Sequence, residues 1–493
     1  MLYLLLSIPF FTGVLCWLSL PLKWLERINV LGAALTGALA FYAALGVFRE
    51  QSLAHAGSLL VIDELSAVLV FIIGMVGTLC CLYSVQYLWT DLKNGELTEN
   101  KIGRFFGLLH FFIATMYLSV LADNLGLMWV AIEGTTIVSA LLVAFYGHKA
   151  ALEAAWKYII ICTVGIAFAM LGIILTFYAA REILGSGDIS LSWRSLYPVA
   201  ASLDPSVMKL AFIFVLVGYG TKAGLFPLHT WLPDAHSQAP SPVSALLSGV
   251  LLNCAIYAIV RFHLLTSLSA GSGFSGHLLM IFGLISMAAA VPFILVQKDI
   301  KRLLAYSSVE HVGIIVLGLG LGGVLGYTGA ILHLINHALA KSALFLTAGT
   351  LTQKYNSKLI ARIQGIGQLL PITGTLFMAS LLAIGGAPPF GLFFSELTVA
   401  TRGFHSAGVL LGFLFLMVIA IVFAGLVYFG GKMYFSDTPS RFFKGESLTA
   451  SHLLILLPIG LLIFQGIYMP QTVQELIDQV VQFITVGGGV ANV

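Results

Sequence analysis

The sequence predicts an all-α polytopic membrane protein with about 14 transmembrane helices. Of its 493 residues, 59% are hydrophobic and only 9% are charged, whereas a soluble domain carries about a quarter charged residues. Apolar stretches of roughly 20 residues, the length that crosses the ~30 Å hydrocarbon core of a bilayer, recur along the whole chain. These stretches are too long and too evenly apolar for the alternating strands of an outer-membrane barrel.

The expected helices share this length and apolar character. They lie near residues 2–20, 29–48, 64–88, 105–122, 125–147, 154–180, 207–227, 241–265, 276–296, 301–320, 326–352, 369–402, 408–434 and 452–470. Because equally apolar runs follow throughout, the first stretch is expected to stay as a helix rather than to be cleaved as a signal peptide.

We expect the spans to form four units. Residues 1–104 hold helices 1–3, residues 105–266 a first repeat of helices 4–8, residues 276–434 a second repeat of helices 9–13, and residues 452–493 helix 14 and a C-terminal tail. The polar connections between the spans are too short to fold as soluble domains.

Two of the expected helices are interrupted by glycine and proline. The sequence GLFP at residues 224–227 breaks the seventh helix beside Lys222, and GGAPPFG at residues 385–391 breaks the twelfth beside Glu396. Two such spans, five helices apart, indicate a transporter built from inverted five-helix repeats, because an odd number of helices inverts the second copy. The alternative is that these are proline kinks that serve packing alone.

Ionisable side chains recur inside the apolar spans. A charged group at the bilayer centre costs at least about 3 kcal/mol, so each needs a partner or a task. The set comprises Glu133, Lys157, Lys222, Glu310, His311, His333, His337, Lys341 and Glu396. A row of them indicates a hydrated path for protons, in which a carboxylate such as Glu133 switches the protonation of Lys222. Static Lys–Glu pairs that hold helices together are the alternative.

His333, His337 and Lys341 are spaced four residues apart and therefore share one face of a helix. The two histidines lack the following glutamate of a zinc protease and a third ligand nearby in sequence, so a metal site is not expected. Proton exchange is favoured, since histidine titrates near neutral pH and a desolvated lysine moves toward it.

Cysteine and charge usage exclude other classes. The five cysteines form no CxxC pair or Cys/His cluster, which predicts no iron–sulfur cluster, structural zinc or disulfide. A net charge of +3 without a basic run gives no reason to expect nucleic acid as a partner. Lysine and arginine concentrate in the loops on one side, while the other side holds few, Arg261 among them. The positive-inside rule then puts both termini on the outer side.

Four segments carry a resemblance to a known family: KAGLFPLHTWLPDAHSQAPSPVSALLSGVLL, QKDIKRLLAYSSVEHVGII, HLINHALAKSALFLTAGT and GGAPPFGLFFSE. They resemble the antiporter-like subunits shared by respiratory complex I, Mrp-type cation/proton antiporters and energy-converting membrane-bound [NiFe] hydrogenases. Within the family, AIEGTTIVSALLVAFY, EAAWKYIIICTVGIA and SSVEHVG look most like the F component of hydrogenase-4 and its relatives in formate hydrogenlyase-type complexes.

The resemblance implies roles for the intramembrane residues. Glu133 and Lys222 match the charge pair that gates proton uptake, Lys341 with His333 and His337 matches the central relay, and Glu396 matches the acidic residue of the broken twelfth helix. Asn253 departs from the pattern, because many relatives have a lysine there. Water, or one of the residues His229, His236, Glu310 and His311, would then have to bridge the two halves.

The expected function is the translocation of protons, or of sodium against protons, by a subunit of a multi-subunit redox complex in a prokaryotic cytoplasmic membrane. The resemblance favours an energy-converting hydrogenase or a formate hydrogenlyase-like complex, and complex I or an Mrp antiporter is the alternative. We expect no redox chemistry and no cofactor in this chain. Its partners would be lipid, other membrane subunits and, indirectly, iron–sulfur and [NiFe] or quinone-site subunits. A non-conducting spacer is a further alternative, which Asn253 keeps open.

Overall fold

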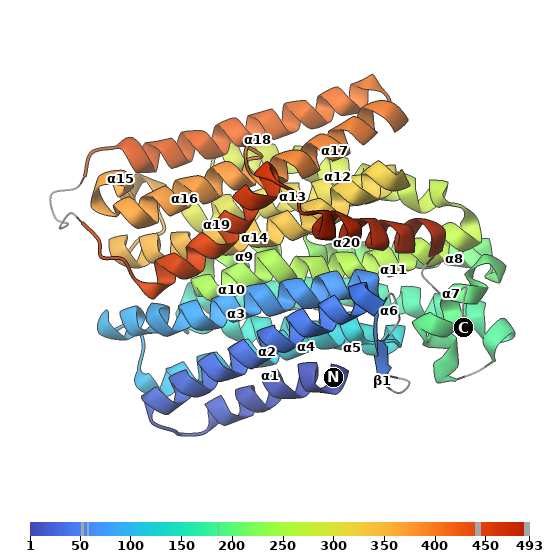
Figure 1. Ribbon diagram of the computed structural model, residues 1–493, viewed down its shortest axis with the longest axis horizontal. Helices are drawn as coiled ribbons and strands as arrows, with labels where there is room; N and C mark the ends of the chain where they lie inside the picture. Colours follow the sequence, from blue (N-terminus) through green and yellow to red (C-terminus); the bar gives the residue numbers. More distant parts are fainter. Residues whose placement is uncertain (51–53, 57–58, 186, 439–444, 488–493) are drawn as a thin grey trace.

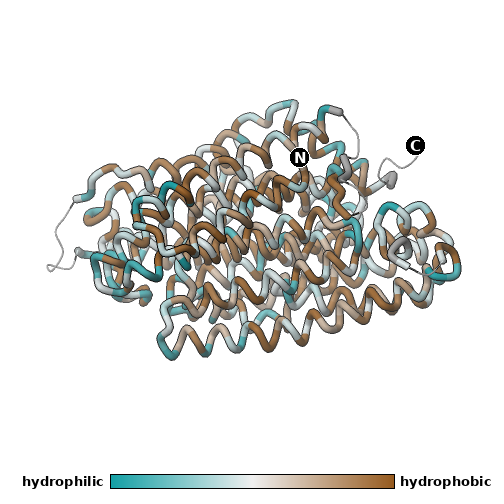
Figure 2. Tube along the Cα trace, turned by 90° about the horizontal axis from the view of Figure 1, so that it is seen from below, coloured by the Kyte–Doolittle hydropathy of each residue, from teal (hydrophilic) through white to brown (hydrophobic). Residues whose placement is uncertain are grey.

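Long helices that lie side by side make up most of the computed structural model (Figure 1). It describes residues 1–50, 54–56, 59–185, 187–438 and 445–487. Hydrophilic residues gather mainly at the two ends of the helices, and hydrophobic residues dominate between them (Figure 2). This distribution fits a bundle that crosses a bilayer along the helix axes.

The helices of the bundle are α1 (Leu2–Trp17), α2 (Leu22–Glu50), α3 (Glu64–Lys93), α4 (Glu99–Leu121), α5 (Leu125–Val143), α6 (Lys149–Leu184), α8 (Pro205–Ala223), α9 (Trp231–Gln238), α10 (Ser241–Leu246), α11 (Leu252–Ala270), α12 (Ser272–Leu295), α13 (Ile300–Leu321), α14 (Gly323–Tyr355), α16 (Pro371–Ile384), α17 (Gly391–Ser406), α18 (Val409–Phe435) and α19 (Ala450–Ile467). Short elements connect or flank them: strands β1 (Ala54–Ala56) and β2 (Leu60–Ile62), and helices η1 (Asp188–Leu191), α7 (Trp193–Val199), η2 (Ala200–Ser202), η4 (Ile360–Arg362), α15 (Ile366–Leu369), α20 (Gln471–Gln482) and η5 (Phe483–Gly487).

The predicted fold class is confirmed. Among the described residues, 12 helices are long and apolar enough to span a membrane, counting α10 to α11 as one, and α1 and α16 are shorter apolar helices. Two details differ from the prediction. The short antiparallel hairpin of β1 and β2 was not expected, and the eighth span contains a π-helical turn, η3 (Leu247–Leu251), between α10 and α11.

Both predicted breaks are present. The seventh span consists of α8 and α9, and α8 ends at Gly224, whose φ of +79° is the left-handed conformation that favours glycine. A Cβ at this glycine would lie 2.6 Å from Cδ1 of Leu232, so a side chain here would have to displace that leucine. The twelfth span consists of α16 and α17, separated by residues 385–390.

The two five-helix groups place the break in the same position. In the order α4, α5, α6, α8 with α9, and α10 with α11, the fourth member is broken. The order α12, α13, α14, α16 with α17, and α18 repeats this pattern. Since five crossings invert the direction of the second group, the arrangement is that of inverted repeats. The exact boundaries of the four units stay a prediction.

One buried ion pair ties the start of α3 to α11. Asp63 caps α3 by accepting a hydrogen bond from the Ser66 amide at 2.9 Å, and its Oδ2 lies 2.6 Å from Nη2 of Arg261. The guanidinium also lies over the rings of Trp193 and Tyr257, at 4.5 and 4.7 Å. Arg261 was expected in an outer loop. It is instead buried within α11, because Asp63 and the two rings satisfy its charge.

Candidate ion-translocation site

Lys222 occupies the last turn of α8, directly before the break, and is fully buried. Its ammonium donates hydrogen bonds to Oγ1 of Thr136 at 2.7 Å and to the hydroxyl of Tyr158 at 2.6 Å. The Thr136 hydroxyl in turn donates to Oε2 of Glu133 at 3.1 Å. The predicted pair of Glu133 and Lys222 is therefore joined through a threonine hydroxyl rather than by direct contact.

Glu133 lies on α5 and is only half-buried. Its second carboxylate oxygen accepts a hydrogen bond at 2.8 Å from Thr163 of α6, whose side chain is exposed. Ile137 on the same helix and Ile160 on α6 are also exposed. The carboxylate thus sits between the buried ammonium and the outer surface of the bundle, where a change of charge nearby would reach it.

Lys341 lies on α14 and is fully buried as well. Its ammonium donates to the Ser307 hydroxyl at 2.5 Å and to the Leu304 carbonyl at 2.9 Å, both on α13. In the part of the chain that the structure describes, neither Lys222 nor Lys341 forms an ion pair with a carboxylate. Both ammonium groups are held by neutral oxygen atoms.

A chain of imidazole rings continues from this lysine region toward α17. Nδ1 of His311 lies 3.0 Å from Nε2 of His333, and Nδ1 of His333 lies 2.8 Å from the Ser395 hydroxyl. Glu396 follows Ser395 in the sequence, and only 6% of its surface is exposed. His311, His333 and Glu396 each offer one potential ligand atom, and these three atoms lie within 4.8 Å of one another. A metal ion could bridge them at this distance.

Two further members of the row face this chain. Oε2 of Glu310 lies 3.3 Å from Nε2 of His311, and the ring of His337 lies 5.6 Å from that of His311. Both ring nitrogens of His337 are buried without a protein hydrogen-bond partner among the described residues. The structure thus brings together the predicted residues Glu310, His311, His333 and His337 with Glu396 near them, and unpaired nitrogens leave hydrogen-bonding capacity for water.

Asn253 lies in the first turn of α11, directly after η3. Its Nδ2 donates to the Gly249 carbonyl of η3 at 2.8 Å, and its Oδ1 is buried without a partner in the described chain. Ser248, which precedes Gly249 in η3, forms a hydrogen bond with Ser308 of α13 at 2.7 Å. Ser308 directly follows Ser307, the serine that binds Lys341. π-helical turns of this kind are frequent at functional sites.

Three candidate residues lie outside this row. Lys157 lies on α6 with about half of its side chain exposed, and it pairs with Glu153 at 2.7 Å and Asp234 at 3.4 Å. His229 lies in the connection after the first break, near aromatic rings. His236 lies on α9, stacked on Phe345 with both nitrogens buried and unpaired among the described residues. Their part in a relay stays a prediction.

Polar cavities lie at opposite ends of α13 and α14. One, of about 400 Å³, is lined by Asp91, Tyr146, Lys301 and Lys358 among others. Burial lowers the pKa of the Lys358 ammonium, which donates to the Ser237 carbonyl at 2.5 Å. The other, of about 490 Å³, is lined by His263, His277, Tyr327 and Arg402 among others. His333, His337 and Lys341 lie on α14 between the two cavities.

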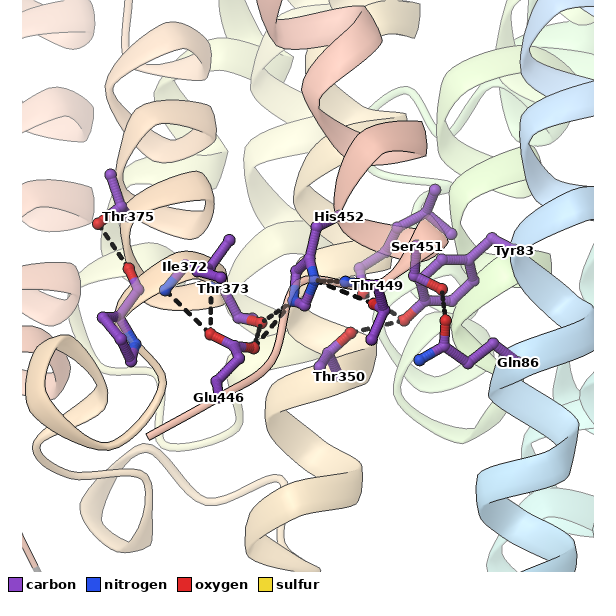
Figure 3. Close-up of polar contacts among 12 residues, drawn as sticks. Tyr83, Gln86, Thr350, Ile372, Thr373, Thr375, Glu446, Thr449, Ser451 and His452 are labelled. Carbon is purple, nitrogen blue, oxygen red and sulfur yellow. Dashed lines mark hydrogen bonds and ion pairs between the residues drawn. The ribbon is translucent and has the colours of Figure 1, made fainter. Parts of the chain in front are cut away.

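A third polar cavity, of about 470 Å³, adjoins the first and is bounded by the segment before α19. Glu446 and His452 are among its lining residues, and Figure 3 shows the polar contacts between them. Glu446 accepts hydrogen bonds from the Ile372 and Thr373 amides, both at 2.9 Å, and contacts Nε2 of His452 at 2.9 Å. The carboxylate thereby caps the start of α16 and fixes the first turn of α19 against it.

Sequence reasoning missed the hydroxyl groups that hold the charged residues. Thr136, Tyr158, Ser307 and Ser395 each contact a charged or titratable group of the row. Only the contact of Thr136 could have been predicted from helix periodicity, because Thr136 lies three residues after Glu133 and therefore on the same face of the helix. The contacts of Tyr158 and Ser307 come from other helices, and sequence spacing carries no information on them.

The broken helices, inverted groups and buried titratable row are features of antiporter-like, multi-span membrane subunits. The comparisons agree. The family described as NADH:quinone oxidoreductase/Mrp antiporter, TM matches residues 122–424. The chain is 41% identical over 348 residues, 71% of its length, to a hydrogenase-4 component F homolog of Methylacidiphilum infernorum (isolate V4), covering 73% of that protein.

Two solved structures share the fold. One is a chain of the membrane-bound sulfane sulfur reductase, an archaeal respiratory membrane complex, with a TM-score of 0.86 at 24% identity. The other is a chain of the Mrp complex from Dietzia sp. DQ12-45-1b, with a TM-score of 0.84 at 19% identity. Each alignment covers 98% of this chain and 97% of the other. The protein belongs to the family of antiporter-like membrane subunits of NADH:quinone oxidoreductases and Mrp antiporters.

Proposed function

We propose that this chain translocates protons, or exchanges sodium for protons, as a membrane subunit of an energy-converting hydrogenase or formate hydrogenlyase-like complex. The observation that supports this most is the way both buried ammonium groups are held. Lys222 and Lys341 contact hydroxyl and carbonyl oxygens, and neither is locked to a carboxylate in the described chain. A buried lysine without a fixed counter-ion is able to change its protonation state when a neighbouring charge changes.

Glu133 is the group that would impose this change on Lys222. An ionised carboxylate, connected through the Thr136 hydroxyl, favours the protonated lysine. Loss of that negative charge removes the electrostatic support and favours proton release toward the second half of the chain. The hydroxyl itself both accepts and donates a hydrogen bond, so it links the two groups without carrying a charge.

The second half offers groups that would carry the proton onward. Lys341 would receive it, and the rings of His311 and His333 would carry it to Ser395 and Glu396. Asn253 holds no proton at neutral pH, so transfer between the halves would pass through water held by its free Oδ1 and by the serines beside it.

The orientation that we propose puts both termini on the outer side of a prokaryotic cytoplasmic membrane. The lysine-lined cavity with Lys301 and Lys358 then opens to the cytoplasm, and the cavity with His263 and Arg402 opens outward. Uptake would occur at the first and release at the second. Lipid would surround the bundle where no subunit packs against it.

The driving reaction would take place in neighbouring subunits that hold iron–sulfur clusters and a [NiFe] or quinone site, while this chain would carry no redox cofactor. The hydrogenase assignment is supported by the similarity to a hydrogenase-4 component F homolog. Co-purification of this chain with iron–sulfur and nickel–iron subunits would distinguish it from an Mrp-type antiporter, and association with an NADH-oxidising arm would indicate complex I.

The test uses the assembled complex in inverted membrane vesicles, with Lys222→Ala and Glu133→Ala. We expect both variants to assemble and to lose redox-driven acidification of the vesicle lumen. Lys209→Ala, on the same helix α8 beside Phe274, is the matched control and should acidify like the unmodified complex. Normal acidification in both test variants would contradict the proposal and favour a non-conducting spacer.

A further inference from the structure

Three titratable side chains from three helices converge inside the second repeat. His311 comes from α13, His333 from α14 and Glu396 from α17, and one ligand atom of each lies within 4.8 Å of the others. Two imidazoles and a carboxylate are the ligand set of many catalytic zinc and non-haem iron sites. No metal site was expected from the sequence, because His333 and His337 were the only candidate ligands close together in it. The residues that the fold brings together form a different group.

The distance between the two imidazoles suits a metal ion. Nδ1 of His311 and Nε2 of His333 are 3.0 Å apart. Zinc–nitrogen bonds of about 2.0–2.1 Å in tetrahedral geometry place two ligand nitrogens roughly 3.3 Å apart. A separation of the rings by a few tenths of an ångström would therefore turn the hydrogen bond that they share into a pair of metal bonds.

The remote nitrogen of one ring is already held as in a metal site. Nδ1 of His333 lies 2.8 Å from the Ser395 hydroxyl, and Nε2 of His311 lies 3.3 Å from Oε2 of Glu310 in a close contact without a hydrogen bond. Metal-binding histidines almost always make such a contact with a carboxylate or another polar group, which fixes the tautomer and aims the other nitrogen at the ion. Both contacts leave the facing pair, Nδ1 and Nε2, for a ligand.

His337 supplies a fourth position. Its ring lies 5.6 Å from that of His311, and both of its nitrogens are buried without a protein partner in the described chain. Either this imidazole or a water molecule would complete a tetrahedron. Two or three nitrogen ligands disfavour magnesium and calcium, which prefer oxygen, and favour zinc.

We propose that Zn²⁺ binds to His311, His333 and Glu396, and that the bound ion stops translocation. Binding needs both facing nitrogens unprotonated, so the ion displaces the proton that the two rings share. The lone pairs that would accept the next proton are then occupied. The binding stands independently of transport, whereas the inhibition rests on the proposed function.

Binding is tested on the purified complex after treatment with a chelator. Zn²⁺ titration calorimetry and X-ray absorption at the zinc edge report affinity and ligand type. We expect a nitrogen and oxygen shell without sulfur, and an affinity that falls by about 10-fold or more in each of His333→Gln and the near-isosteric Glu396→Gln. Ser395→Ala, which removes only the contact to the remote nitrogen, should weaken binding by roughly 10-fold.

His452→Gln is the matched control, because His452 and Glu446 form another buried histidine–carboxylate contact. It should bind zinc like the unmodified complex. Unchanged affinity in both His333→Gln and Glu396→Gln, or a loss confined to His452→Gln, would overturn the proposal. A sulfur shell would also overturn it.

Acidification assays with added Zn²⁺ separate this inference from the proposed function. Inhibition whose midpoint matches the zinc affinity of this site, in vesicles of the unmodified complex and of His452→Gln alike, supports both. A complex that translocates and binds no zinc at this site overturns the inference and leaves the function intact. A complex that binds zinc there and translocates at full rate confirms the site and contradicts the relay through the two histidines.

Discussion

Lys222 and Glu133 are connected through one hydroxyl group, that of Thr136, which accepts from the ammonium at 2.7 Å and donates to the carboxylate at 3.1 Å. This geometry predicts that Thr136→Val, which keeps the shape but removes the hydroxyl, lowers redox-driven acidification severely while the complex assembles. The ammonium would lose one of its two side-chain partners, and a buried donor left unpaired costs about 1–3 kcal/mol. Initial acidification rates in inverted vesicles measure the effect.

The adjacent Thr135 gives the matched control for that experiment. Its hydroxyl donates only to the Ile132 carbonyl of its own helix, at 2.5 Å. Thr135→Val should therefore leave the rate close to normal. Equal rates for the two valine variants would show that the hydroxyl bridge is dispensable.

Asn253 leads to a prediction for the step between the two halves. Asn253→Leu removes the buried Oδ1 that has no protein partner in the described chain, and with it a site for bridging water. We expect a lower rate of acidification in this variant, while Cys254→Ala at the neighbouring position should have little effect. If the leucine variant acidifies vesicles at the normal rate, the proton does not pass Asn253.

Glu446 is predicted to stabilise the start of α16. Its carboxylate accepts hydrogen bonds from the Ile372 and Thr373 amides (Figure 3). Removing the cap by Glu446→Ala should destabilise this helix end by about 1 kcal/mol, and the two amides should exchange with deuterium several-fold faster. Ser447→Ala, next in sequence, serves as the control. Unchanged exchange at residues 372 and 373 would argue against the capping role.

The buried pair of Asp63 and Arg261 should behave as a structural contact. Arg261→Met leaves a buried carboxylate without its counter-ion, which costs about 3–5 kcal/mol in soluble proteins. The double variant Asp63→Asn with Arg261→Met should recover much of that loss, because no charge is left unpaired. Thermal midpoints of the purified complex measure both. A double variant no more stable than Arg261→Met alone would mean that the arginine acts through its aromatic contacts instead.

Much of the fold was predictable because the bilayer imposes simple rules on sequence. Helix length follows from membrane thickness, and GLFP and GGAPPFG mark the breaks, since each removes backbone hydrogen bonds at a fixed position. The hairpin of β1 and β2 was missed because it is only three residues per strand and lies between spans. The π-helical turn η3 depends on packing against other helices, and no residue in it signals one.

The candidate site was only partly predictable, for a related reason. Charged residues in an apolar span stand out in a sequence, which identified Lys222 and Lys341 directly. Their partners do not stand out, because threonine, serine and tyrosine are common in membrane helices, and the contacts cross between helices far apart in sequence. Lys157 illustrates the same limit. It lies within the long apolar helix α6, as its sequence context predicts, but its pairing with Asp234 of α9 is not visible in the sequence spacing.

The Glu396 carboxylate is predicted to keep its position only because Gly386, next to it, has no side chain. The φ of Gly386 is +74°, and a Cβ there would lie 2.0 Å from Oε2 of Glu396. Gly95 has nearly the same φ, +76°, but a Cβ would meet no atom within 4 Å. Each alanine variant pays about 1 kcal/mol for the left-handed conformation, so thermal midpoints should fall in both.

Only Gly386→Ala also forces the carboxylate to move, because a methyl group and Oε2 cannot share that space. Acidification by the assembled complex should therefore drop in Gly386→Ala and stay near normal in Gly95→Ala, although both lose stability. The comparison separates the backbone cost from the displacement of Glu396. If both variants acidify equally well, the position of the Glu396 carboxylate does not limit translocation, and the last step of the relay must run through other groups.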